Sequence, residues 1–210
     1  MSLNKKVFIF TAFLIGVAVL GVFLASRTIL IKGYVALERR QMERNLSRAL
    51  YAVYSVGSEV RILVSDWAHW DDAYNFVEDK NEEFIRVNLD DATFKATRLN
   101  IIAFADNNGE FVYGKFYDSK EGSELPFPES LKLHINRQDK LISQIGEDYV
   151  SGLIKIPEGL MLVSSGPVVK SNGEGPVKGI IIMGRILDQS VSQKVKDITQ
   201  FPAAILDLAD

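Results

Sequence analysis

The chain has 210 residues, of which 47% are hydrophobic, enough for one packed domain with an appendage. Beyond residue 26 the balance is 22 basic against 27 acidic residues, so no broad positive surface exists for a phosphate backbone and we expect no nucleic-acid partner. Cysteine is absent, which excludes disulfides, thiolate metal sites and cysteine nucleophiles.

The first element is an uncharged apolar run of twenty residues from Val7 to Ser26. At about 1.5 Å per residue, a helix of this length reaches roughly 30 Å, the thickness of a bilayer's hydrocarbon core. A signal peptide has a shorter apolar stretch, and a buried core helix rarely lacks polar residues on every face. The run therefore predicts a transmembrane helix. Its orientation stays open, because Lys5 and Lys6 favour a cytoplasmic N-terminus whereas four basic residues between 27 and 40 oppose it.

A long helical pattern follows, which we define as a signalling and dimerisation helix over residues 27–64. Apolar residues recur at alternating steps of four and three, as in the seam of a coiled coil, with an interruption at Gly57. The seam residues are Met42, Leu46, Ala49, Val53, Val56, Val60, Leu63 and Trp67. Either this helix packs on the sheet of its own domain, or it continues the membrane span and pairs with its twin in a homodimer through residues 42–67. Both can hold on successive parts of the helix.

The remaining elements predict an α+β domain. Helix is expected to continue over residues 66–79 and an amphipathic helical stretch over 81–100. The pattern then becomes strand-like, with Gly109 supplying a positive φ in the first hairpin. The predicted strands are IIAFAD, EFVYGKFYD, YVSGLIKI, GLMLVSSGPVV and KGIIIMGRIL, of which the last two read as central. This order predicts a single antiparallel five-stranded sheet behind the long N-terminal helix.

Smaller elements complete this pattern. A loop is expected over 119–130, with short helices at 129–134 and 139–145. Asp188 is expected to cap a final helix, and the ending 201–210 to form a short strand. Val191, Val195 and Ile198 would share one face of that last helix.

The stretch SDWAHWDDAYNF, residues 65–76, contains both tryptophans of the chain beside adjacent carboxylates. On a continuous helix, the candidate residues Trp67, Trp70, Asp71 and Tyr74 fall within a sector of roughly 120°, while Asp72 projects elsewhere. In one interpretation the rings pack against the sheet and Asp71 bonds a nearby N–H group. In the other, the rings wall a ligand pocket in which Asp71 or Asp72 binds an ammonium or hydroxyl group.

Catalytic constellations are missing from the sequence. The two histidines, His69 and His134, lie 65 residues apart, and neither a Gly-x-Ser-x-Gly elbow nor a phosphate-binding loop occurs. A metal site built on His69 and Asp72 lacks further obvious ligands. We therefore expect no catalytic residue, no metal and no cofactor, and the pair Asp90–Asp91 is interpreted as a helix cap or surface feature.

Four stretches carry a resemblance to a known family. These are SDWAHWDDAYNFVEDKNEEFIRVNL, LNIIAFADNNGEFVYGK, SGLIKIPEGLMLVSSGPVV and GPVKGIIIMGRILDQSVSQKVKDIT. In this order they resemble the type-four CHASE domain, a cyclase/histidine-kinase-associated sensory extracellular domain, over roughly Val35–Leu208. The resemblance implies a PAS/Cache-like fold, a cytoplasmic tail at residues 1–6, and an extracytoplasmic sensor domain at 65–208 held at the cell membrane by one span. The ligands of that family are mostly unknown.

The resemblance also implies a function. Members lie upstream of diguanylate cyclase or phosphodiesterase modules, which handle cyclic di-GMP, or of histidine kinases of two-component systems. We expect this chain to be the front part of such a receptor, sensing a small-molecule or protein stimulus, with any catalysis in a downstream module. The alternative is a stand-alone membrane-anchored interaction module that binds a partner receptor or envelope protein.

Overall fold

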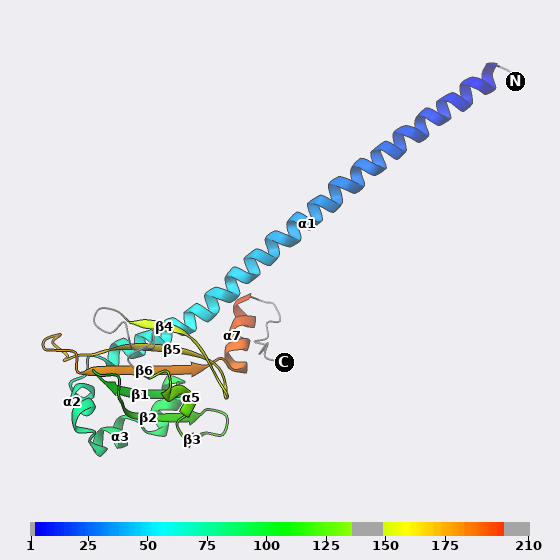
Figure 1. Cartoon of the computed structure of the whole chain (residues 1–210). Helices are drawn as coiled ribbons and strands as arrows, with labels where there is room; N and C mark the ends of the chain where they lie inside the picture. Colours follow the sequence, from blue (N-terminus) through cyan, green and yellow to red (C-terminus); the bar gives the residue numbers. More distant parts are fainter. Residues whose placement is uncertain (1–2, 136–148, 200–210) are drawn as a thin grey trace. The chain divides into compact units, whose positions relative to one another are not determined.

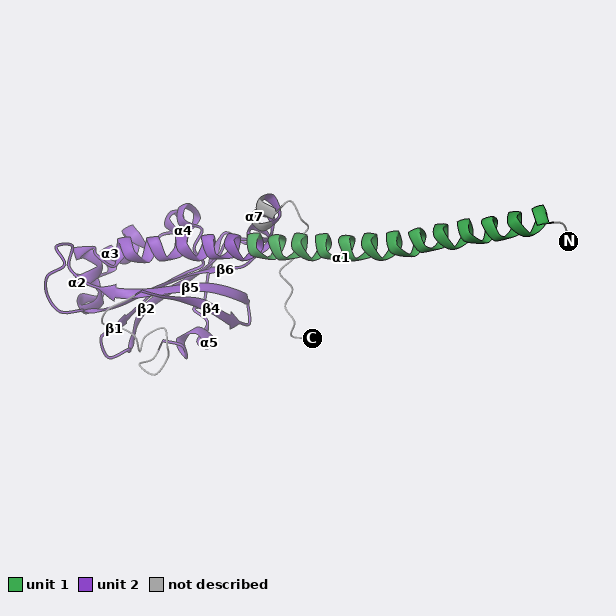
Figure 2. Ribbon diagram, turned by 90° about the horizontal axis from the view of Figure 1, so that it is seen from above, with its two compact units in different colours: residues 1–48 green, residues 49–210 purple. Residues whose placement is uncertain are grey.

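The computed structural model describes residues 3–135 and 149–199. The chain divides into two compact units, Met1–Arg48 and Ala49–Asp210 (Figure 2). The helix α1 (Leu3–Trp67) makes up the described part of the first unit and enters the second. One described helix, α1, is long and apolar enough to cross a membrane, with a mean hydropathy of 2.8 in its most apolar window. No residue of that window is buried, as expected of a segment that faces lipid.

The second unit contains a six-stranded antiparallel sheet in the order β3-β2-β1-β6-β5-β4 (Figure 1). Its strands are β1 (Ile101–Asp106), β2 (Phe111–Asp118), β3 (Ser123–Leu125), β4 (Val150–Ile156), β5 (Gly159–Val168) and β6 (Gly179–Ile186). β1 and β6 are central and pair along their length, with Ala103 opposite Ile182. The five predicted strands are confirmed, as is the turn at Gly109, whose φ is 81°.

Short helices complete the second unit. They are α2 (Asp71–Asp79), α3 (Glu82–Asn88), α4 (Asp91–Thr97), α5 (Glu129–Lys132) and α7 (Gln189–Thr199). Side-chain oxygens cap three of them: Asn81 accepts from the Phe84 N–H, Asp90 from Thr93 and Asp188 from Ser190, at 2.8, 2.8 and 2.9 Å. The expected cap at Asp188 is therefore confirmed, and Val191 on α7 is buried.

The two faces of the sheet carry separate apolar clusters because side chains alternate along a strand. On β1, Ile102 and Phe104 face the cluster formed with α1, α2, α3 and α4, while Ile101, Ala103 and Ala105 face the cluster that includes α5. Figure 2 shows α1 and α5 on opposite sides of the strands.

The seam of α1 is used inside its own domain. Ala52, Val56, Val60, Val64 and Trp67 are buried within the second unit. The interpretation of a helix laid on its own sheet therefore holds over these residues. In contrast, the predicted seam residues Met42 and Leu46 are 68% and 60% exposed.

Several sequence-based expectations need correction. The sheet has six strands, not five, because Ser123–Leu125, predicted as loop, pairs with the end of β2. The helix expected over 66–79 breaks after Trp67 and restarts at Asp71. The helix expected at 139–145, the strand at 201–210 and the side chains of Val195 and Ile198 lie outside the described residues.

Candidate functional site

The two indoles lie at the junction of α1 and α2. Trp67 is the last residue of α1 and is buried, whereas Trp70 occupies the extended position before α2 and is partly exposed. Their rings stack with centroids 4.6 Å apart and planes 21° apart. The turn is held by hydrogen bonds from the Trp70 N–H to the Trp67 carbonyl and from the Val169 N–H to the Ala68 carbonyl, at 3.1 and 2.8 Å. The indoles thus join two helices and do not share one.

Asp71, the first residue of α2, is tied to the loop between β5 and β6. Its carboxylate accepts hydrogen bonds from the backbone N–H and the hydroxyl of Ser171 at 3.0 and 2.9 Å. These backbone and side-chain bonds lower the pKa of Asp71, opposed by desolvation and aided by the charge of Lys170. Asp71 itself is exposed.

Tyr74 on α2 contacts two lysines that lie outside this helix. Its buried ring has the Nζ atoms of Lys170 and Lys178 at 5.6 and 5.7 Å from the centroid, within cation–π range. Lys178 also pairs with Glu78 at 2.6 Å. Two lysines of the β5–β6 loop region therefore contact α2 through the ring of Tyr74.

A cavity of about 290 Å³ lies at this contact. Its lining is formed by Asp71, Tyr74, Asn75, Lys170, Ser171 and Asn172. A carboxylate, an ammonium group, amides and a hydroxyl thus meet beside an aromatic ring, which suits a small polar molecule. Of the predicted residues, Asp71 and Tyr74 line this cavity, whereas Trp67 and Trp70 do not.

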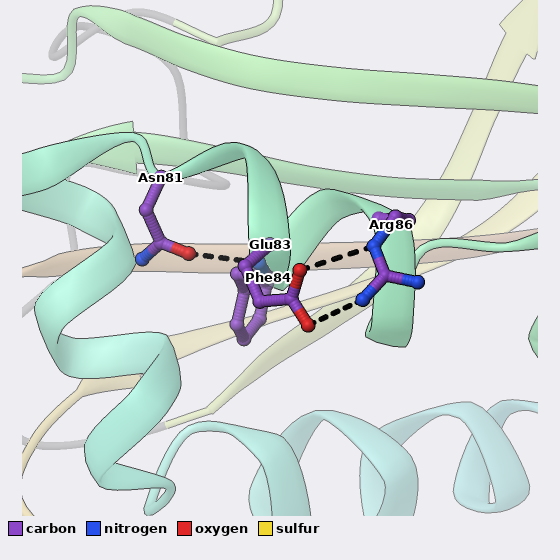
Figure 3. A network of polar contacts seen from close by, with 4 residues as sticks. All are labelled: Asn81, Glu83, Phe84 and Arg86. Atoms are coloured by element: carbon purple, nitrogen blue, oxygen red, sulfur yellow. Dashed lines mark hydrogen bonds and ion pairs between the residues drawn. The ribbon is translucent and has the colours of Figure 1, made fainter.

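Asp72 lies apart from that cavity. It lines a separate space of about 300 Å³ together with Asp79, Asn81 and Glu83. Figure 3 shows that Glu83 is already paired with Arg86 and that Asn81 caps α3 through the Phe84 N–H. Within the described residues, no group of three or more His, Cys, Asp or Glu side chains is arranged to hold a metal ion.

Sequence reasoning missed Lys170, Ser171 and Lys178. The stretch SNGEGP, residues 171–176, indicates only a flexible turn between two strands, and nothing local indicates that Ser171 meets Asp71, 100 positions earlier. The available signal was one lysine on either side of the stretch, Lys170 and Lys178. The contact between Ser171 and Asp71 becomes visible only in the folded structure, where the sheet places the β5–β6 loop beside α2.

A third hollow lies within the folded unit, between α1 and β4. This groove has a volume of about 630 Å³ and is walled by Leu50, Tyr51, Tyr54 and Leu153, which are 62%, 68%, 75% and 52% exposed. Four large apolar side chains thus remain exposed on one groove of the folded unit.

Comparison with solved structures defines the class of the fold. The sensor domain of the Vibrio cholerae histidine kinase DctB aligns with a TM-score of 0.50 at 9% identity, covering 75% of this chain and 58% of that one. The Escherichia coli DcuS sensor domain aligns with a TM-score of 0.48 at 14% identity, covering 70% and 99%. The helix-backed antiparallel sheet is a PAS/Cache-like fold, as the resemblance implied.

The family follows from the sequence match. The model of the CHASE4 domain matches residues 58–206, so the chain belongs to the CHASE4 domain family. A curated relative, the methanogenesis regulatory histidine kinase FilI of Methanothrix harundinacea (strain 6Ac), is 31% identical over 153 residues. That alignment covers 72% of this chain but only 17% of the relative, so the chain spans a minor part of that protein's length.

Proposed function

We propose that this chain is the extracytoplasmic sensory part of a membrane-bound receptor, with Val7–Ser26 crossing the membrane. The observation that carries the proposal is the order of the two parts: a helix of membrane-spanning length and composition precedes a folded CHASE4 domain. A topology reporter fused after residue 210 tests it, with activity expected outside the cytoplasm. A reporter active only in the cytoplasm would overturn the receptor assignment.

For the output we favour a histidine kinase. The support is the relative FilI, itself a histidine kinase, most of whose length lies beyond the matched part. Catalysis would then belong to a module downstream of this domain. Reading the gene past codon 210 tests the choice: a diguanylate cyclase or phosphodiesterase module there would replace the kinase assignment and keep the sensor assignment.

The stimulus is proposed to act at Asp71 and Tyr74. A small polar molecule that takes the hydrogen bonds of the Asp71 carboxylate would displace Ser171 and free the β5–β6 loop from α2. Trp67 and Trp70 would pass this change to the end of α1, since their rings are stacked across the junction. Asp72, on the neighbouring cavity, would tune the local charge. Such a relay needs two discrete packings of one element, and the ligand has to bind one of them better.

We further propose a homodimer through α1, in which the groove residues of the folded unit meet the partner. Val56 and Val60 are occupied by the protein's own core, so they are not available for pairing. Leu50 and Tyr54 are exposed one helical turn apart, which fits a contact between two helices. The proposed dimer therefore uses a different face of the 42–67 helix from the predicted seam and keeps the expected partner, a second copy of the chain.

A further inference from the structure

A further cavity, of about 320 Å³, lies where β1 begins and β2 and β6 end. Its lining includes three cationic side chains, Lys95, Arg98 and Arg185, against one carboxylate, Asp188. The whole chain has a net charge of −3, so the positive charge of this cavity is opposite in sign to the net charge of the protein. The cavity shares no residue with the Asp71–Tyr74 cavity.

The base of this cavity is a rigid frame built on Asn100. Its side-chain amide donates to the Tyr117 carbonyl and the Ser119 hydroxyl at 3.0 and 3.2 Å, and its oxygen accepts from the Ile186 N–H at 2.8 Å. One buried side chain thereby fixes the ends of three strands. The cationic groups above it are held on a preorganised support, which lowers the ordering cost of binding.

Arg98 stands in a backbone conformation that arginine disfavours. It ends α4 with φ 59° and ψ 28°, the left-handed region in which glycine is the usual choice. Its side chain has no hydrogen bond or ion pair to any residue that the structure describes. Arg98 thus places a cationic side chain, without a partner among the described residues, at the cavity wall.

Arg185 supplies a second guanidinium, and it is 7% exposed. Burial lowers its pKa, and repulsion from Arg98 adds to this, while Glu59 and Asp188 act in the opposite direction. The Arg185 guanidinium lies 3.7 Å from the Glu59 carboxylate, between Nη1 and Oε2, and it also donates to the Ser190 hydroxyl at 3.3 Å. The Asp188 carboxylate is committed to the N–H groups that open α7. Two guanidinium groups thus line one cavity, and of the two only Arg185 has a carboxylate partner among the described residues.

A buried hydroxyl lies in the same wall. Tyr117 is 1% exposed, and among the described residues its hydroxyl has no hydrogen-bond partner. A Cβ added at Gly122, in the turn after β2, would lie 3.7 Å from it. A buried hydroxyl without a partner costs free energy, which an acceptor entering through this turn would recover.

We propose that this cavity binds a small oxyanion with two or more negative charges, of the phosphate or sulfate class, between Lys95, Arg98 and Arg185. The volume is at the small end for ligand pockets, which fits a compact ion. Because Arg185 lies near the end of β6 and Asp188 and Ser190 open α7, the bound anion joins the sheet to the last described helix. The site is independent of the sensor assignment and of the Asp71 cavity.

The test is titration of the whole purified chain in a phosphorus-free detergent with sodium phosphate, at constant ionic strength set by chloride. Saturable binding by calorimetry, with a rise in Tm, is expected. Arg98→Gly should weaken binding at least about tenfold, because hydrogen bonds to a charged partner are lost, yet it should not lower Tm, because glycine suits the left-handed backbone. The same titration with glycerol 3-phosphate, a fragment of a lipid headgroup, distinguishes a lipid source from the free ion: tighter binding than that of phosphate indicates a lipid headgroup. Loss of glycerol 3-phosphate binding in Arg98→Gly supports the same site.

The matched control is Lys80→Gly. Lys80 ends α2 with φ 51°, is exposed, and does not line the cavity, so this variant removes the same charge and the same backbone strain. Its phosphate affinity should equal that of the wild type. The proposal is overturned if the wild type shows no saturable binding, or if Arg98→Gly and Lys80→Gly bind phosphate equally well.

Discussion

The Asp71 carboxylate accepts both the backbone N–H and the hydroxyl of Ser171, a residue 100 positions later in the chain. This contact joins the first turn of α2 to the loop between β5 and β6. It lies beside the stacked indoles of Trp67 and Trp70, where α1 ends. A molecule that competes for Asp71 would therefore act on the junction between a long helix and the sheet it covers.

The contact predicts a pH-dependent stability. The pKa of Asp71 is lowered in the folded chain from its ordinary value of 3.8, so its stabilising effect is complete above that value and is lost as pH falls through the lowered pKa. Asp71→Asn should lower Tm at neutral pH, and the difference from wild type should shrink below about pH 4. Thermal melts followed by circular dichroism measure this. Asp72→Asn is the control, and a difference that stays constant down to pH 3 would contradict the role of the Asp71 charge.

Tryptophan emission should report the proposed stimulus. Trp70 is partly exposed and stacked on the buried Trp67, so displacement of the neighbouring loop should shift or quench emission. A fluorescence screen of small polar metabolites should contain compounds that do so, and Trp70→Phe should remove most of the response. If a broad screen leaves emission and Tm unchanged, the aromatic cluster serves packing alone.

Substitutions on α1 should separate dimerisation from folding. Leu50→Glu and Tyr54→Glu place charges on an exposed surface, so they should raise the dimer dissociation constant at least about tenfold and leave the fold intact. Val56→Glu should unfold the domain, since this side chain is 0% exposed and an isolated buried charge is costly. Sedimentation of the detergent-solubilised chain gives the mass. Wild-type dimer mass in both exposed variants would argue against this interface.

A side chain at Gly179 should weaken the pairing of β1 with β6. A Cβ there would overlap the carbonyl oxygen of Ala105 and lie 2.8 Å from Cγ1 of Val77. Gly179→Ala should lower the free energy of unfolding by about 1–3 kcal/mol, the usual cost of overpacking. In Gly152→Ala the new methyl group meets nothing within 4 Å, so this variant should change stability little. Urea unfolding monitored by circular dichroism compares the two, and equal losses would show that packing at Gly179 is not the cause.

Much of the fold could be predicted from local pattern. The alternation and apolar runs of the five main strands, the turn at Gly109 and the cap at Asp188 depend on neighbours a few residues away, and the structure confirms them. The candidate site was predicted less well. Asp71 and Tyr74 do share a cavity, but a continuous helix was assumed across Ala68 to Trp70, where the chain turns instead.

The sequence by itself determined an apolar segment of membrane-spanning length, an acidic α+β domain and its family, because composition and short-range periodicity suffice for these. Only the tertiary structure decided what each polar group meets. Ser171 reaches Asp71, and Arg98 faces the same cavity as Arg185, because strands distant in sequence are neighbours in the sheet. The third strand likewise forms only where the end of β2 offers it unpaired backbone groups.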